Sequence, residues 1–174
     1  MKSYLTRITL GFVLVLSSFA HAQDSKVNWN TITDYDNHCT IMFPTLPTET
    51  YKNTAEGFKT TTHSLYGQSS YFLKILQFKN EPSDKKAKAT KVLTSLASKV
   101  KGKVTEQVDW VEGSDTGVKG IIVIPGDGAA KPEMTVLCNV IIVGSVQYQI
   151  MVLTPTEIYD EAFDGRFVSS FKFI

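Results

Sequence analysis

The sequence has few of the residues from which catalytic and metal sites are usually built. It contains two cysteines and three histidines, and it has no Cys-x-x-Cys pair, no Gly-x-Ser-x-Gly and no glycine-rich phosphate loop. His38 and His63 have no ligand spacing around them, so we interpret both as solvated or hydrogen-bonded side chains. The sequence therefore predicts no catalytic residue, no metal ligand and no cofactor.

One triplet, Asp115-Thr116-Gly117, matches the active-site triplet of aspartic proteases. That chemistry needs two copies whose carboxylates share a proton, and the chain holds a single copy. Asp and Gly are also common turn residues, so we interpret the triplet as part of a turn.

Net charge and long apolar runs are also nearly absent. The formal charge of +1 over 174 residues argues against nucleic acid or an anionic membrane as the partner of the whole surface. The longest apolar run, residues 8–19, follows Lys2 and Arg7 and precedes Ala20-His21-Ala22. It is shorter than the roughly 18 residues that a membrane anchor needs, and it ends in a small-x-small cleavage site. Residues 1–22 are therefore expected to be a cleaved signal peptide.

Cleavage after Ala22 would leave residues 23–174 as a single exported domain, periplasmic or secreted. Its 152 residues are enough for one hydrophobic core, and its 16 basic and 17 acidic residues give a net charge of −1. It contains no further segment that could span a membrane.

The two cysteines, Cys39 and Cys138, leave two alternatives open. In an oxidising compartment they could form a disulfide that closes a long loop, which would stabilise the domain by about 4–5 kcal/mol. Both also lie in apolar, strand-like runs, where unpaired buried cysteines are common. The choice depends on whether their Cα atoms come within about 7 Å.

Alternating and fully apolar runs predict most of the secondary structure. Cys39, Ile41 and Phe43 share one face of a strand that Pro44 ends, so we expect Ile41 and Phe43 in the core. Further strands are expected at residues 63–66, 71–78, 104–111, 118–124, 135–143 and 146–153. Gly144-Ser145 alone separates the last two, which predicts a tight hairpin with a type II′ turn.

Two segments have helical patterns. In residues 81–103 the apolar side chains recur at helical spacing between Pro82-Ser83-Asp84 and Gly102. Thr154-Pro155-Thr156-Glu157 resembles a capping box and predicts a C-terminal helix that carries Ile158, Ala162, Phe163 and Phe167. Hairpins with two one-sided helices predict an α+β fold, a mostly antiparallel sheet flanked by helices.

With an early Trp29, a strand that ends in MFPTLPTE, the hairpin VGSVQYQI and the terminal RFVSSFKF in this order, the chain resembles PsbP-like proteins. These share the α/β/α sandwich of the extrinsic photosystem II protein and of a Ran-binding nuclear-transport factor. The resemblance covers Trp29 to the C-terminus. It implies an uncharacterised exported branch without a catalytic signature, so it carries no residue's role over to this chain.

The strongest local charge feature is a run of lysines without acids in residues 85–103. Such a run is most often the solvated side of an amphipathic helix, but it could also bind an acidic partner. We therefore hypothesise a non-catalytic exported binding or assembly module with a protein partner in the envelope, whose partner patch comprises Lys88, Lys91, Lys99 and Lys101.

The alternative hypothesis is a small-ligand carrier or hydrolase. Its pocket would lie between the sheet and the C-terminal helix and would be lined by Tyr148, Tyr159, Phe163 and Phe167. Aromatic residues at helical spacing are more often core, so a solid core at this place would contradict the hypothesis.

Overall fold

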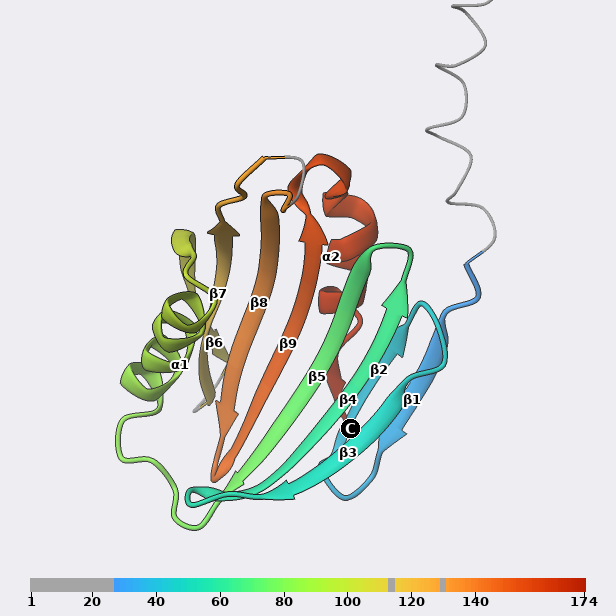
Figure 1. Ribbon diagram of the computed structural model, residues 1–174. Helices are drawn as coiled ribbons and strands as arrows, with labels where there is room; N and C mark the ends of the chain where they lie inside the picture. Colours follow the sequence, from blue (N-terminus) through green and yellow to red (C-terminus); the bar gives the residue numbers. More distant parts are fainter. Residues whose placement is uncertain (1–26, 113–114, 129–130) are drawn as a thin grey trace, which may run out of the picture.

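Three layers make up the fold in the computed structural model, which describes residues 27–112, 115–128 and 131–174 (Figure 1). A seven-stranded antiparallel sheet forms the middle layer. Helix α1 (Lys85–Lys99) covers part of one face, and a three-stranded sheet together with helix α2 (Glu161–Ser169) covers the other. The predicted α+β class, a mostly antiparallel sheet flanked by helices, is confirmed. The predicted signal peptide, residues 1–22, lies outside the described residues.

The large sheet has a hydrophobic core on each face, and successive side chains of its central strands point alternately into one and the other. In spatial order its strands are β3 (Thr48–Asn53), β4 (Gly57–Tyr66), β5 (Ser69–Phe78), β9 (Val146–Pro155), β8 (Met134–Val143), β7 (Asp115–Ile124) and β6 (Lys103–Glu112). On β5, Tyr71, Leu73 and Ile75 belong to the core beneath the small sheet. Phe72 and Lys74 therefore project from the opposite face, the one on which α1 lies.

The small sheet and α2 close the other face. β2 (Cys39–Phe43) lies between β1 (Asn30–Asp34) and β10 (Lys172–Phe173), and α2 packs beside it. Ile41 and Phe43 are buried as predicted, and the Phe43 ring lies 5.0 Å from that of Phe167 on α2.

Helix α1 lies close to the sheet because glycine faces it. It packs on β6, β7 and β8 through Ala89, Leu93 and Ala97, which are buried. A Cβ on Gly120 of β7 would lie 2.6 Å from Cδ2 of Leu93, so a larger residue there would push the helix outward. At its start Asp84 accepts a hydrogen bond from the Ala87 amide at 2.8 Å.

The predicted type II′ hairpin is present. Val143 pairs with Val146 across Gly144-Ser145, and of these two turn residues Gly144 alone has a positive φ, 54°. The β4–β5 turn at Gly67-Gln68 has the same pattern, with a φ of 58° at Gly67.

Two polar strands were not predicted. β1 and β3 lie in stretches that we read as irregular, because they lack the apolar alternation of a half-buried strand. β3 is an edge strand with every residue exposed. Besides its backbone pairing it contacts β4 through exposed side chains, as in the stacking of Tyr51 on Phe58 at 5.9 Å. Between β2 and β3, Pro44 to Pro47 carry the chain from the small sheet to the edge of the large one. The Pro-containing segment therefore ends one strand and changes sheets.

The predicted capping box does not form. Thr154 and Pro155 remain in β9, where the Thr154 hydroxyl lies 2.7 Å from that of Ser69 and Pro155 pairs with Met134. A 3₁₀ turn, η3 (Thr156–Ile158), follows, and α2 begins three residues later with Asp160 as its N-cap. Strand pairing across the sheet outcompeted the local capping pattern, as tertiary contacts often do.

The aspartic-protease triplet lies in a strand and not in a turn. Asp115, Thr116 and Gly117 are the first residues of β7 and pair with β6.

Candidate functional site

The structure divides the predicted lysine patch among different surfaces. Lys88 and Lys99 share one side of α1 at helical spacing, the side toward β5, since the Lys88 ammonium lies 4.9 Å from the centre of the Phe78 ring. Lys91 is exposed on another side of α1, in a shallow depression of about 440 Å³ beside Asp84 and Thr94. Lys101 follows the helix in a left-handed conformation, with a φ of 57°. The four lysines therefore do not form one patch.

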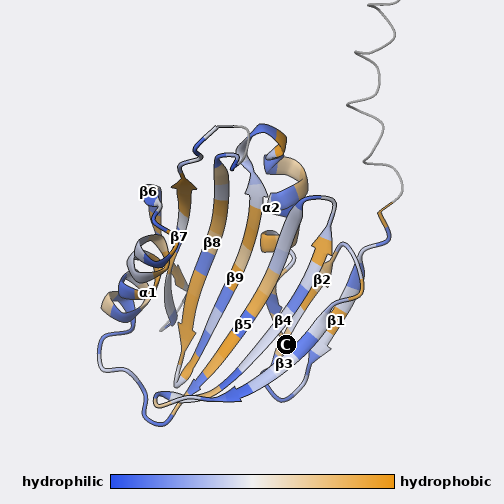
Figure 2. Cartoon of the chain, viewed as in Figure 1, coloured by the Kyte–Doolittle hydropathy of each residue, from blue (hydrophilic) through white to orange (hydrophobic). Residues whose placement is uncertain are grey.

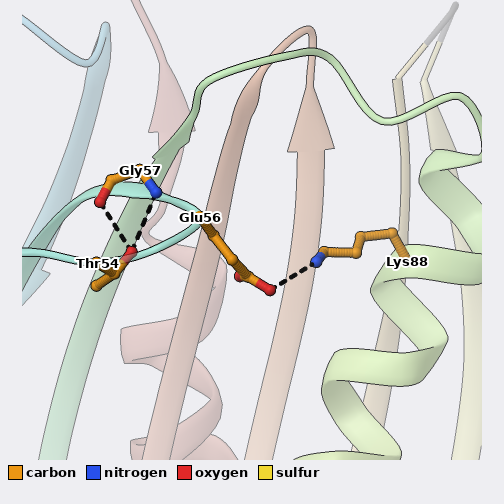
Figure 3. A network of polar contacts seen from close by, with 4 residues as sticks. All are labelled: Thr54, Glu56, Gly57 and Lys88. Carbon is orange, nitrogen blue, oxygen red and sulfur yellow. Dashed lines mark hydrogen bonds and ion pairs between the residues drawn. The ribbon is translucent and has the colours of Figure 1, made fainter.

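Lys88 connects α1 to the β3–β4 turn. Its Nζ lies 3.3 Å from Oε1 of Glu56, and the turn is held by Thr54, whose hydroxyl donates to the Gly57 carbonyl at 2.8 Å and accepts from the Gly57 amide at 3.1 Å (Figure 3). This ion pair is partly exposed, so it contributes little stability. It fixes the place of Lys88, which makes that lysine less available to a partner.

Beside α1, half of the same sheet face carries no helix. Figure 1 shows α1 in front of β6 and β7, with no described element in front of β5, β4 or β3. We call this surface the open face and define it by six side chains that the register places together, namely Lys52, Lys59, Thr61, His63, Phe72 and Lys74. In Figure 2 hydrophilic and pale colours prevail on β3 and β4, unlike the mostly hydrophobic β8. The open face thus combines charged, polar and aromatic side chains on three adjacent strands.

Lysines dominate the charge of the open face. Lys52 of β3 pairs with Lys59 of β4, and Lys74 of β5 lies one row further along the strands. Glu49, the acid of β3, projects to the opposite face, where it accepts a hydrogen bond from Thr62 at 3.2 Å. In the described part of the chain, these strands present no carboxylate on the open face.

Of these three lysines, Lys74 is the one whose charged form is disfavoured by its surroundings. It is half-buried, and burial lowers its pKa, as do the nearby charges of Lys59 and Lys99. Among the described residues no carboxylate lies within ion-pair distance of it. Its ammonium lies over the Phe72 ring at 5.1 Å, a weaker source of stabilisation. A half-buried cation of this kind is stabilised when an anion approaches.

Phe72 and His63 form the aromatic floor of the open face. Their rings stack at 4.5 Å with an interplanar angle of 15°. Nε2 of His63 is buried and has no hydrogen-bond partner among the described residues. Neither Lys59 nor Lys74 stood out in the sequence analysis, although a lysine inside the apolar run YFLKIL was the available sign of a special position.

The two cysteines are free and lie on opposite faces of the large sheet. Cys39 belongs to the core between the two sheets, and Cys138 to the core beneath α1. Of the two alternatives, the unpaired buried cysteines are therefore present in this structure, and the disulfide is not formed. Desolvation raises the pKa of each thiol to about 12, with a smaller contribution from Asp34 at Cys39.

The predicted pocket beside the C-terminal helix is filled by side chains. Phe167 packs between Phe43 and Tyr71, at 5.0 Å and 5.3 Å between ring centres, while Phe163 packs on Trp29 and Tyr66. Tyr148 packs on Phe171 and Phe173 and donates to the Asn37 carbonyl at 2.8 Å, and Tyr159 is half-buried after η3. This core is solid at the site where the carrier or hydrolase hypothesis needs a cavity.

The described segments contain no group of three or more His, Cys, Asp or Glu side chains arranged to hold a metal ion. They also contain no helix whose length and apolar character would let it cross a membrane.

Similarity to known proteins is found in structure and not in sequence. No family model matches the chain, and no curated protein matches it. The solution structure of cyanobacterial PsbP (CyanoP) from Synechocystis is similar, with a TM-score of 0.62 and 14% identity over 87% of this chain and 96% of that one. The Ran-binding protein Mog1p of Saccharomyces cerevisiae is similar with a TM-score of 0.53 and 10% identity, over 85% of this chain and 96% of that one. Together with the layered architecture, these matches show that the chain has the PsbP-like fold.

Proposed function

We propose that this protein is an exported, non-catalytic module that binds a protein partner in an envelope assembly. The observation that carries this proposal is the group of lysines on the open face and the adjoining side of α1, of which Lys74 is half-buried without a carboxylate. A lysine that is partly desolvated and has no carboxylate partner gains electrostatic stabilisation when an anion binds beside it.

Two further observations support binding over catalysis. The core beneath α2 is filled with aromatic side chains, so that region offers no space for a substrate. One structural neighbour, Mog1p, is described as Ran-binding, an instance of this fold in a protein-binding role. A shared fold does not transfer a partner, so the partner of this chain has to be identified directly.

The test is purification of the protein from its own host after mild crosslinking, followed by mass spectrometry of the accompanying molecules. A reproducible protein companion is the expected result, whereas repeated isolation of the protein alone would contradict the proposal. A co-purifying small molecule without a protein would favour a ligand carrier.

A variant in which Lys88, Lys91, Lys99 and Lys101 are all replaced by glutamate tests the contribution of α1. It is expected to fold, because none of these side chains is fully buried, and to capture less of the companion. Unchanged capture by a folded variant would show that α1 takes no part.

A further inference from the structure

We propose that the open face is the partner-binding surface and that it receives an extended, carboxylate-rich segment of the partner protein. This inference rests on the proposed function, and it moves the site from the outer lysines of α1 to the lysines of β4 and β5. It commits to one kind of occupant, an acidic polypeptide.

The shape of the surface favours a narrow occupant. α1 stands on β6, β7 and β8 and forms a wall along one side of the open face, while β3 is its free outer edge (Figure 1). Lys74 lies between them on β5, next to β9. A chain laid along the strands can reach Lys74, whereas a broad, flat object would meet α1 first.

The charge of the surface selects carboxylates. Lys52, Lys59 and Lys74 present three cations from adjacent strands, and Lys99 approaches from α1 closely enough to lower the pKa of Lys74. Among the lysines named here, Lys88 already forms an ion pair, with Glu56. An incoming carboxylate would relieve the repulsion among the others and offset the desolvation of Lys74.

Polar atoms without partners lie on the same side of the sheet. Nε2 of His63 and Oε1 of Gln147 are both buried and have no hydrogen-bond partner among the described residues. Gln147 pairs with Leu76, whose other neighbour is Lys59, so all three belong to one row across the sheet. Both atoms are buried, and Gln147 is 2% exposed, so they mark a polar row within the sheet and are not contacts for the incoming segment.

Two other anionic classes fit less well. Single-stranded nucleic acid is bound by lysines together with aromatic rings on which bases stack. Here the Phe72 ring is already engaged by His63 and by the Lys74 ammonium. A planar bilayer surface would contact the exposed lysines of α1 before it reached the half-buried Lys74 beside the helix.

Binding of a fluorescein-labelled octapeptide of alternating Ser and Glu, followed by anisotropy, tests the inference. The same peptide with Gln in place of Glu is its neutral control. We expect the acidic peptide to bind, to bind more weakly as salt is added, and to bind about tenfold more weakly to the Lys59→Gln/Lys74→Gln variant. The Lys91→Gln/Lys101→Gln variant removes the same charge elsewhere and is expected to change binding less than about twofold.

Equal weakening by the two double variants, or no difference between acidic and neutral peptides, would overturn the inference. Stronger binding of anionic phosphatidylglycerol vesicles or of an oligothymidylate, lost on Lys59→Gln/Lys74→Gln, would overturn the choice of a polypeptide. Thermal unfolding of each variant shows that it is folded.

Capture from the host separates this inference from the proposed function. If the wild-type protein captures a companion and the Lys59→Gln/Lys74→Gln variant captures it equally well, the open face is not the binding surface. The proposal that the protein is a binding module would remain supported. If the wild-type protein captures no protein, the proposed function itself fails.

Discussion

The hydroxyl of Tyr71 donates a hydrogen bond of 2.8 Å to Oδ1 of Asp164, and both side chains are buried. The bond joins β5 to α2 across 93 positions of the chain. Asp164 also accepts from the Asp160 amide through Oδ2, at 3.3 Å. Because the pair lies between β5 and α2 and is almost fully buried, we interpret it as the polar contact that sets the position of α2 on the sheet.

Removing the donor should destabilise the fold. In Tyr71→Phe, Asp164 keeps its burial and loses its strongest partner, so the free energy of unfolding should fall by about 1–3 kcal/mol. Chemical denaturation measures this change. Tyr66→Phe is the matched control, because in the described residues its hydroxyl has no side-chain hydrogen bond and it contributes a stacked ring. An equal loss in both variants would contradict a special role for the Tyr71 hydroxyl.

The pH dependence of stability should identify Asp164 as a buried acid. Desolvation raises the pKa of Asp164, against the opposing effect of the Tyr71 hydrogen bond. The native state therefore keeps the proton to higher pH than the unfolded state, and stability falls as pH rises from the ordinary aspartate pKa through the raised one. Asn does not titrate, so the stability of Asp164→Asn should not fall over this pH interval. The difference in free energy of unfolding between the variant and the wild type should therefore shift in favour of the variant as pH rises. A constant difference across that interval would contradict a raised pKa.

Two glycines should respond oppositely to a larger side chain. Gly120→Val places atoms against the buried Leu93 and should cost about 1–3 kcal/mol by displacing α1. Gly165 lies within α2, and a Cβ there would meet nothing within 4 Å, so Gly165→Ala should stabilise by about 0.5–1 kcal/mol. Thermal or urea unfolding of both variants checks the signs, and stabilisation by Gly120→Val would show that α1 does not pack as described.

The cysteines should resist modification in the folded protein. With pKa values of about 12, both thiols are protonated at pH 8, and both are buried. Ellman's reagent should therefore react with neither Cys39 nor Cys138 until denaturant is added, after which two thiols should appear. If the denatured, unreduced protein showed no thiol, the two cysteines would be joined in a disulfide, and the prediction of free thiols would be wrong.

Processing of the N-terminus can be tested directly. If residues 1–22 act as a cleaved signal peptide, the protein recovered outside the cytoplasm should begin at Gln23. Intact mass measurement of the protein from fractionated cells checks this, and replacing Ala20 and Ala22 by bulky residues should block the cleavage. A full-length cytoplasmic protein would contradict export.

Local sequence patterns predicted the elements whose form depends on near neighbours. Alternation in residues 39–43 and continuous apolar runs in β5, β8 and β9 located strands, and Gly144 required the turn that joins the last two. The prediction failed in two places. The exposed β3 has no apolar alternation and was not predicted as a strand, and Thr154 was assigned to a capping box although it belongs to β9. Edge pairing and the continued ladder of β9 depend on strands far away in the chain.

By itself, the sequence determined the class of fold, its hairpins, the helical spacing of α1 and the residues that must be buried, because periodicity follows from backbone geometry. Only the tertiary structure decided that Lys59 and Lys74 meet on a helix-free face, that Asp164 reaches Tyr71, and that Cys39 and Cys138 lie on opposite sides of the sheet. These relationships depend on strand order and on which strands α1 covers. They therefore arise from contacts between distant segments, which no local pattern encodes.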